Sequence, residues 1–528
     1  MTTKNQATDP GAFYGLKTRL VVGMEIHVEL DTRSKMWTAA PNVAHPDFFE
    51  SEPNTLLSPV VVGMPGTLPV MNKAAVEMSV LVGLALNCDI AKRCKWDRKS
   101  YWYPDLPKNY QISQYDQPIC GEGYLEIPKP GDERCESPDD PAVSACADTA
   151  GMKRIRITRA HLEEDAGKLL HDLPGGGHSD GSLVDLNRAG TPLLEIVTEP
   201  DFASADEAVT FGQMLRDICR HLGVTQGIMQ KGHMRFEPNI NVVIEKDGET
   251  YKTPIVEIKN LNSFKAVHGA ILHEHTRQIE KWLEDGVVMA SRSKSTRGWD
   301  DAKLVTTPQR EKEDEDEYRY FPDPDLCAVE IDDAMLDAIR ERLVELPTDR
   351  FKRYVDELGL KESDAKGLID EPATTAFFEQ TLAAGADAKQ AAKLLRNNLG
   401  KLANERGVLP DALGISADQL AGVVKLLAAG TIGSNVIDKL VAACMESDDS
   451  PEQLAEQGGM VQVQDDSQLE AWVDEVLANP KLAKAVEDLR GGKQQAIGAI
   501  MGQVMRLSQG SANPGQVTKL IMAKVQGD

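Results

Sequence analysis

The stretch Val22-Gly23-Met24-Glu25-Ile26-His27-Val28-Glu29-Leu30 alternates strictly between apolar and polar side chains. A period of two is typical of a β-strand with one buried face. The aliphatic residues would face a core. Glu25, His27 and Glu29 would then stand in a row on the opposite face, roughly 7 Å apart. The stretch alone leaves two interpretations open, namely a solvated strand face or a row of metal-binding or acid–base groups.

Four further segments in the first two-thirds of the chain place carboxylates or amides on one side and aliphatic residues on the other. A second histidine–carboxylate cluster, His161-Leu162-Glu163-Glu164, lies in the first of these segments. A merely solvated sheet would carry more lysine and threonine. We therefore predict an antiparallel sheet whose apolar face packs on helices and whose polar face lines a cavity. The segments are residues 154–168, 193–199, 235–242 and 256–259.

The remainder of the chain differs, because from Asp332 to the end the pattern is almost wholly helical. Earlier helices are predicted over residues 72–85, 204–222 and 266–285. In the helical part, Ser450-Pro451-Glu452-Gln453 combines a capping serine, a proline at the first helical position and a glutamine for a capping box. The fold class predicted from these patterns is α+β.

Bulk composition excludes several classes of protein. The 528 residues are too many for one core. No run of 18 apolar residues is present, so we expect no membrane span, and the polar N-terminus is not typical of a secretory signal. Eight cysteines without a C-x-x-C pair argue against a disulfide framework or zinc knuckle and favour the cytoplasm. A net charge of −25 argues against a sequence-blind nucleic-acid binder.

Residues 98–115 interleave aromatic side chains with lysine and arginine, and their two prolines prevent a regular element. This composition suits phosphate and base or ribose contacts, although it also fits an aromatic structural loop. Clustered carboxylates with a histidine suit hard cations. Together these groups favour metal-assisted phosphoryl transfer, while His27 or His161 as a general base is the alternative. The chain has no phosphate-loop motif, so ATP would bind in another way.

Seven blocks of this sequence resemble, in order, the signature segments of the B subunits of the aspartyl/glutamyl-tRNA amidotransferases. The similarity runs from about residue 18 to residue 525. The blocks are GMEIHVEL, YWYPDLPKNYQISQYDQPI, RITRAHLEEDAGK, VDLNRAGTPLLEIVTEPD, EIKNLNSFKAV, YRYFPDPDL and GQVMRLSQGSANPGQVTKLIMAKV.

The resemblance implies an activity in translation. In such a complex an amidase partner releases ammonia from glutamine or asparagine, and a small third protein completes the heterotrimer. The protein of the type resembled here phosphorylates the side-chain carboxylate of mischarged Glu-tRNA(Gln) or Asp-tRNA(Asn) with ATP, and ammonia from an internal channel displaces phosphate. A carboxylate is a poor electrophile, and the acyl phosphate must be kept from water. The choice between the two tRNAs stays open, because no motif encodes it.

The resemblance also implies a set of site residues. The implied Mg²⁺ ligands are Glu25, His27 and the pair Glu163-Glu164, of which the binding member stays open. The implied catalytic residues are Glu25, His27, Lys99, Lys108 and Asp185, with the two lysines where ammonia enters. We expect the cofactor ATP to contact Arg98, Tyr101, Tyr103, Arg156 and Arg235.

The implied fold is a cradle resembling the catalytic sheet of glutamine synthetase, followed by a helical domain and a tail that touches tRNA. With the change of pattern near Asp332, we predict a leader, a catalytic cradle, a helical domain and a helical tail. Their predicted ranges are 1–17, 18–327, 328–448 and 449–528.

Two departures from the family pattern matter. Many members carry zinc-binding cysteine pairs in the region corresponding to residues 35–62, and this chain has no cysteine there, so we expect no structural zinc. Glu237 stands where aspartate is commoner, so we assign it no metal role.

Two rival functions remain. A stand-alone ATP-dependent ligase using free ammonia should work without partner or tRNA. A non-catalytic RNA-binding scaffold should tolerate Glu25→Ala and His27→Ala.

Overall fold

The chain forms two compact units, residues 1–352 and 353–528. The predicted leader lies partly outside the described residues, although Pro10–Tyr14 form a short 3₁₀-helix. The boundaries predicted at 327/328 and 448/449 stay predictions. The computed structural model describes residues 10–129, 151–173, 177–290, 294–311, 318–462, 466–508 and 512–526.

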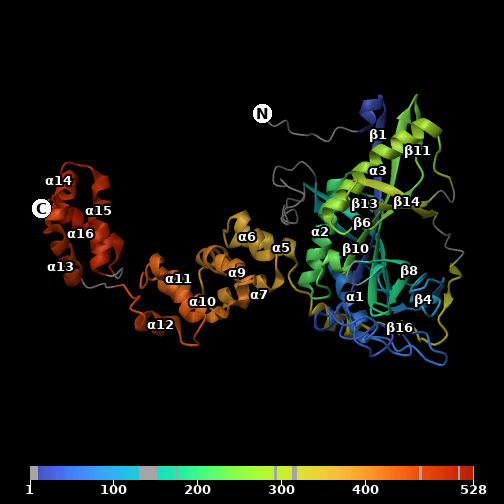
Figure 1. The fold of residues 1–528 in the computed structure, drawn as a ribbon, viewed down its shortest axis with the longest axis horizontal. Helices are drawn as coiled ribbons and strands as arrows, with labels where there is room; N and C mark the ends of the chain where they lie inside the picture. The colour runs from blue at the N-terminus through green and yellow to red at the C-terminus, as the bar shows by residue number, and fades with distance from the viewer. Residues whose placement is uncertain are drawn as a thin grey trace. The chain divides into compact units, whose positions relative to one another are not determined.

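A large sheet organises the first unit (Figure 1). Its strand order is β14-β13-β12-β10-β1-β9-β6-β5, with β11 paired to the side of β10. The opening stretch of the sequence analysis lies in β1, at the middle of this order. The strands are β1 (Lys17–Glu29), β5 (Gly123–Pro128), β6 (Met152–Glu164), β9 (Pro192–Thr198), β10 (Met234–Lys246), β11 (Glu249–Lys252), β12 (Val256–Lys259), β13 (Ser295–Asp300) and β14 (Val305–Glu311).

The α+β class is confirmed, but the prediction of a purely antiparallel sheet is wrong at one pair. β12 and β13 run parallel, whereas the other described pairs of this sheet are antiparallel. Parallel neighbours need a crossover connection. Here it contains the helix α3 (Phe264–Asp285), which returns the chain to the same end of the sheet before β13 begins.

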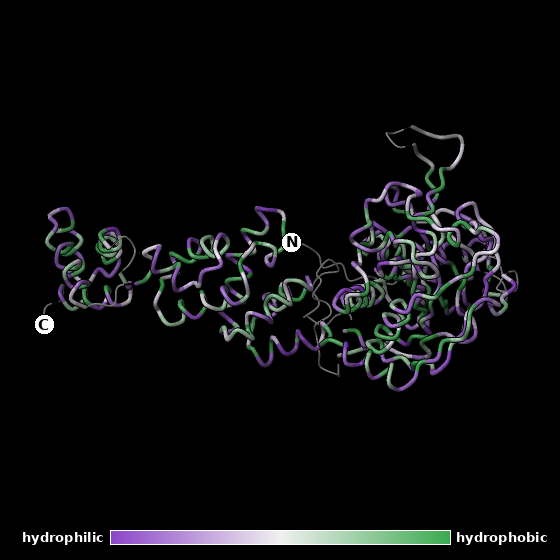
Figure 2. The backbone as a smooth tube through the Cα atoms, turned by 90° about the horizontal axis from the view of Figure 1, so that it is seen from below, coloured by the Kyte–Doolittle hydropathy of each residue, from purple (hydrophilic) through white to green (hydrophobic). Residues whose placement is uncertain are grey.

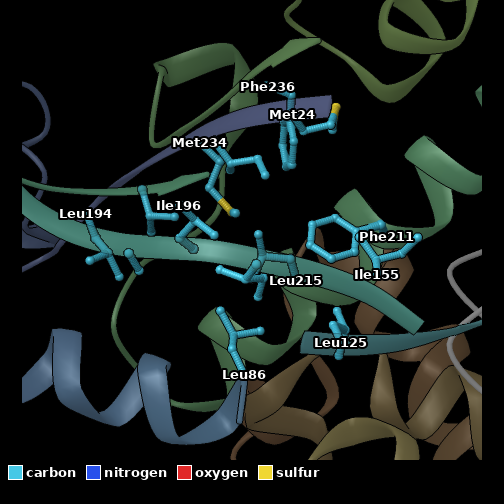
Figure 3. Packing of buried hydrophobic residues seen from close by; sticks show 14 of the residues in the cluster. Met24, Leu86, Leu125, Ile155, Leu194, Ile196, Phe211, Leu215, Met234 and Phe236 are labelled. Carbon is cyan, nitrogen blue, oxygen red and sulfur yellow. The ribbon is translucent and has the colours of Figure 1, made fainter. Parts of the chain in front are cut away.

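The two faces of β1 differ as its alternation predicts. Met24, Ile26 and Val28 are fully buried, and Figure 3 shows Met24 beside Phe236 of β10, with Met234 farther along the same strand. Leu194 and Ile196 of β9 continue this apolar surface. The buried core therefore lies on one side of the sheet, and the polar residues between these positions are left on the other.

Helices cover the apolar face, and their starts follow from capping residues. α1 (Lys73–Ala85) begins after Asn72, whose side chain accepts from the Ala74 N–H. α2 (Ala205–His221) begins after Ser204, which accepts from the Glu207 N–H. α3 begins two residues earlier than predicted, because Ser263 caps it. α2 packs on α3, and α3 packs on β10 (Figure 1).

A β-bulge in β6 decides which of its side chains reach the polar face. Ile157 pairs with Thr198 and Arg159 with Val197, so Thr158 is an extra residue between them. Side chains alternate strictly along a regular strand, and one extra residue exchanges the two faces. Before the bulge Ile155 and Ile157 are buried in the core. After it, the odd-numbered His161 and Glu163 lie on the polar face.

Three small pairings complete the first unit. β15 (Phe321–Pro322), β3 (Asp97–Ser100) and β4 (Tyr110–Ser113) form one sheet. Strand β16 (Val329–Glu330) pairs with β2 (Arg93–Cys94). A hairpin is formed by β7 (Lys168–Leu173) and β8 (Gly177–Asp185), and residues 174–176 lie outside the described residues. After β16, the unit ends with α4 (Asp333–Arg340) and α5 (Pro347–Lys352).

The second unit is helical throughout its described regular elements, as predicted. Figure 2 shows hydrophilic and hydrophobic residues alternating along its helices. Ser450 and Gln453 form the predicted capping box of α12. Its α-helices are α6 (Glu362–Ile369), α7 (Pro372–Ala383), α8 (Ala388–Lys393), α9 (Gly400–Arg406), α10 (Ala417–Ala428), α11 (Ile437–Cys444), α12 (Pro451–Gln457), α13 (Asp466–Leu477), α14 (Ala483–Arg490), α15 (Ile497–Leu507) and α16 (Pro514–Gln526), with π-helical turns at Arg353–Glu357 and Leu394–Leu399.

The last four helices have a core of their own. Leu469 and Val473 of α13 pack with Ile500 and Val504 of α15 and Ile521 of α16. Across the described residues, no helix is long and apolar enough to span a membrane.

Candidate active site

The polar face of the sheet is the floor of a cavity of about 790 Å³. This volume is in the range of small-molecule sites. The floor and the walls come from different parts of the chain. Strands of the main sheet supply the carboxylates. Strand β3, the loop after it and residues 318–319 supply a lysine, an arginine and aromatic rings. The lining residues are Glu25, His27, Lys99, Ser100, Tyr101, Trp102, Tyr103, Asn109, Glu195, Glu237, Glu257, Lys259, Thr296, Tyr318 and Arg319.

One group of possible metal ligands joins three strands. Oxygen atoms of Glu163 and Glu195 and a ring nitrogen of His27 all lie within 4.8 Å of one another. The His27 Nε2 atom is 3.5 Å from Glu195 Oε2 and 3.8 Å from Glu163 Oε1. The register explains this grouping, because His27 of β1 and His161 of β6 both pair with Glu195 of β9. We call His27, Glu163 and Glu195 the histidine cluster.

Burial and charge set the protonation of the histidine cluster. Burial disfavours the charged ring of His27, but the hydrogen bond and charge of Glu195 outweigh it and raise the His27 pKa to about 9. Burial and the charge of Glu195 raise the pKa of Glu163. Burial opposes ionisation of Glu195, but two imidazoles and the Lys99 ammonium hold its pKa well below the usual range. Since metal ligands bind deprotonated, a cation here would compete with protons.

A second group lies one step along the sheet. Carboxylate oxygens of Glu25, Glu237 and Glu257 lie within 4.8 Å of one another. Glu25 pairs with Glu237 across β1 and β10, and Glu257 follows on β12. Three carboxylates are the oxygen ligands that hard cations prefer. Lys259 ion-pairs with both Glu237 and Glu257. We call the three glutamates the glutamate cluster.

The structure separates the two glutamates between which the sequence could not choose. Glu163 belongs to the histidine cluster, whereas Glu164 points to the other face of β6 and ion-pairs with Lys108. Glu164 Oε1 also accepts from the Ile112 N–H, at 3.0 Å. Lys108 and Glu164 therefore anchor β4 to β6, and neither is among the described residues that line the cavity.

Lys99 reaches the cavity through a set of aromatic rings. Its Nζ lies 5.8 Å from the ring centre of Tyr101 and 5.0 Å from that of Tyr318. Burial opposes its charge, but Glu163 and Glu195 outweigh burial and raise the Lys99 pKa. The charges of Glu163 and Glu195 thus favour the protonated, positively charged form of Lys99.

Arg235 serves a buried ion-pair network at the end of β1. Its Nη2 donates to Asp165 Oδ2 at 2.7 Å, and Arg188 Nε lies 3.6 Å from the same oxygen. Burial and the charge of Asp165 raise the pKa of Glu29, the third polar residue of the opening stretch. Among the described residues lining the cavity, neither Arg235 nor Glu29 appears.

Three other predicted residues also have partners away from the described lining of the cavity. Arg98 donates to Asp323 at 2.7 Å and to Asp325 at 2.9 Å. Arg156 donates to Asp201. Asp185 accepts from the N–H groups of Asn54 and Asn187. Their predicted catalytic or ATP-binding roles stay predictions.

The structure brings together Glu25, His27, Lys99, Tyr101 and Tyr103 of the predicted set, all on the cavity wall. Residues that received no role from the sequence share the wall. Alternation had placed Glu195, Glu237 and Glu257 on a polar strand face, which was the available signal. Tyr318 and Arg319 had no such signal, because they reach the cavity only through the pairing of β15 with β3.

Both clusters suit a bound divalent cation by their donor atoms. Their five glutamates, on the neighbouring strands β12, β10, β1, β9 and β6, outnumber the two lysines of the described lining, Lys99 and Lys259. The expectation that the chain holds no zinc stays a prediction.

Comparisons with known proteins cover nearly the whole chain. Residues 20–337 match the family described as the GatB/GatE catalytic domain, and residues 376–525 match the family described as the GatB domain. The chain is similar to proteins named as the B subunit of aspartyl/glutamyl-tRNA(Asn/Gln) amidotransferase. It is 42% identical over 504 residues to the one from Rhodopirellula baltica, covering 95% of this chain and 96% of that protein. It is 42% identical over 506 residues to the one from Listeria monocytogenes, covering 96% and 98%.

Proposed function

Because the chain belongs to the family of B subunits of aspartyl/glutamyl-tRNA(Asn/Gln) amidotransferases, we propose that it activates and amidates the carboxylate of mischarged tRNA in this cavity. Enzymes of this family are glutamine-hydrolysing carbon–nitrogen ligases. The substrates are Glu-tRNA(Gln), Asp-tRNA(Asn) or both, with ATP as co-substrate. The partners are an amidase that supplies ammonia and a small third protein of the heterotrimer.

The proposed reaction has two steps. An oxygen of the side-chain carboxylate attacks the γ-phosphorus of ATP, and ADP leaves. The nitrogen of ammonia then attacks the carbonyl carbon, inorganic phosphate leaves, and the nitrogen loses a proton. Both steps bring anions to a floor of glutamates, so a cation is needed between them.

The residues divide these tasks. His27, Glu163 and Glu195 would hold one Mg²⁺, and bound Mg²⁺ would neutralise phosphate charge. Glu25, Glu237 and Glu257 would offer oxygens for another, although the sequence alone gave Glu237 no metal role. Lys99 would hold the substrate carboxylate or a phosphate oxygen with its fixed charge. The aromatic wall would keep water from the acyl phosphate.

The observation that carries this proposal is the convergence of two groups of possible cation ligands and one partly buried lysine at one cavity. A scaffold that only binds RNA would have no use for a buried group of carboxylates, which burial and mutual repulsion make costly.

The test is ATP hydrolysis by the chain assembled with its amidase and the small third protein, with and without each mischarged tRNA. We expect phosphate release that depends on a mischarged tRNA and disappears in Glu25→Ala. Glu122→Ala is the matched control, because Glu122 is exposed and is not among the described residues lining the cavity. Release without tRNA would favour a stand-alone ligase, and no release in any combination would leave the scaffold.

A further inference from the structure

Two large aromatic side chains stand at the open edge of the cavity. Trp102 is 75% exposed and Tyr103 is 45% exposed, although both line the cavity. Exposing an indole to water has no benefit for folding. Within the described part of the chain, no ring or hydrogen-bond partner explains the position of Trp102, whereas the neighbouring Tyr101 donates to Gln111 and packs on Tyr318.

Arg319 lines the same cavity and is exposed. The other two basic residues of the lining already face carboxylates, since Lys259 ion-pairs with Glu237 and Glu257 and Lys99 lies close to Glu163 and Glu195. Among the residues that the structure describes, no carboxylate forms an ion pair with Arg319. Its guanidinium is thus available to an anion at the edge of the cavity.

The backbone of Arg319 is held in an uncommon conformation. Its φ is +48°, a left-handed value that is rare for residues with a long side chain. The two neighbouring tyrosines account for it. The Tyr320 ring stacks on Tyr115 with ring centres 4.4 Å apart, and Tyr318 packs edge-on against Tyr101. Such strain persists where the surroundings determine it and is concentrated at ligand-binding positions.

The tyrosine contacts are fixed further along the chain. Directly after Tyr320, Phe321–Pro322 pair with Asp97 and Arg98, and Asp323 accepts from Arg98. Contacts on both sides of Arg319 therefore hold it in the wall of the cavity that Trp102 also lines. An exposed aromatic ring and an exposed guanidinium in one cavity suit single-stranded RNA, in which a base stacks on the ring and a phosphate meets the cation.

We propose that Trp102 and Arg319 form a binding site for the unpaired 3′-terminal nucleotides of aminoacyl-tRNA. The inference rests on the proposed function and deepens it. The amino acid to be amidated is attached to the 3′ end, so a chain entering from solvent must cross the edge of the cavity before its carboxylate reaches Lys99. The adenine of ATP is the competing ligand for the same ring. A polymer fits the exposure of Trp102 better, since RNA continues from the cavity into solvent.

The test measures tRNA binding to the full chain by fluorescence anisotropy. The probes are tRNA(Gln) with its complete 3′ end and the same tRNA lacking the terminal adenosine. For the complete probe, we expect Trp102→Ala to weaken binding by roughly 5- to 150-fold, the range for one base stacked on an aromatic ring. Trp102→Phe should restore most of the affinity. For the truncated probe, Trp102→Ala should have little further effect, because the stacking partner is absent.

The role of Arg319 is tested separately, by how the affinity for tRNA depends on salt concentration. Arg319→Ala should lower the slope of log affinity against log salt by about 0.7, the value for one phosphate contact on a single strand. Arg319→Lys should restore the slope. The control is Arg19→Ala, at a site on β1 outside the described lining of the cavity, which should leave the slope unchanged.

Three results would overturn the proposal. The first is an equal loss for complete and truncated tRNA in Trp102→Ala. The second is unchanged tRNA binding with a raised KM for ATP, which would assign the ring to adenine. The third is unchanged tRNA binding with loss of the amidase on co-purification, which would assign it to a protein interface. Each leaves wild-type, tRNA-dependent ATP hydrolysis intact, so it is distinct from failure of the proposed function.

Discussion

Two adjacent glutamates should respond in opposite ways to the same substitution. Glu164→Gln removes the charge that faces Lys108, and both side chains are almost completely buried. Breaking a buried pair by removing one partner costs about 3–5 kcal/mol, because the remaining charge is left uncompensated. Glu163→Gln instead removes one of two facing carboxyl groups in the histidine cluster. Without a cation it should leave the free energy of unfolding unchanged or raise it.

Added Mg²⁺ should separate the two substitutions in a second way, through the stabilisation that the cation itself provides. A ligand at 100 times its Kd stabilises the folded state by about 2.7 kcal/mol, and Glu163→Gln should lose this increment while Glu164→Gln keeps it. The assay is urea unfolding of the full chain, with and without Mg²⁺, followed by ATP hydrolysis of the assembled enzyme. Loss of the Mg²⁺ increment in Glu164→Gln but not in Glu163→Gln would refute the assignment of Glu163 to the cluster.

Three further predictions follow from particular contacts. Burial lowers the pKa of Lys35 from 10.5 to about 7, so between these pH values the unfolded chain binds more protons than the folded chain. The free energy of unfolding of the wild type, relative to that of Lys35→Met, should therefore rise with pH by at most about 1.4 kcal/mol per pH unit. A difference in urea midpoints that does not change with pH would contradict this. Arg98→Ala should lower the free energy of unfolding by about 3–5 kcal/mol, because it leaves the buried carboxylate of Asp323 without its ion-pair partner. Residues 318–326 should then become sensitive to limited proteolysis. An unchanged cleavage pattern would argue against the Arg98–Asp323 ion pair as the contact that holds this segment. Gly212→Ala should lower the free energy of unfolding by about 1–3 kcal/mol, because its Cβ would lie 2.9 Å from the Phe264 ring; a urea midpoint equal to that of the wild type would mean that the ring moves freely.

Local pattern was sufficient to predict what each strand of the floor presents. The alternation of β1 identified its buried face, and the same rule correctly placed Glu195, Glu237 and Glu257 on polar faces. These are properties of single strands with a period of two. The helix starts at Ser204 and Ser450 were predictable for a similar reason, because a capping side chain bonds to a backbone N–H only a few residues away.

Which carboxylates meet was not predictable, because it depends on register between strands distant in sequence. The resemblance places Glu25 and His27 at one cation, which stays a prediction, and strand pairing in addition places Glu25 beside Glu237 of β10, far along the chain. The bulge at Thr158 was equally impossible to predict from the sequence. Without it, His161 and Glu163 would continue the face of Ile155 and Ile157 and would point into the core.

The choice between Glu163 and Glu164 shows how the local sequence pattern and the pairing of distant strands act together. Adjacent residues of a strand point to opposite faces, so the alternation alone requires that only one of the two lies on the polar face of the sheet. The bulge then decides which one, and the partner of the other follows, since a carboxylate buried away from the cavity needs a cation. Lys108 supplies that cation from a loop that the sequence marked as basic and aromatic. One inserted residue in β6 thus gives Glu163 its place in the cluster and Glu164 its role as an anchor of β4.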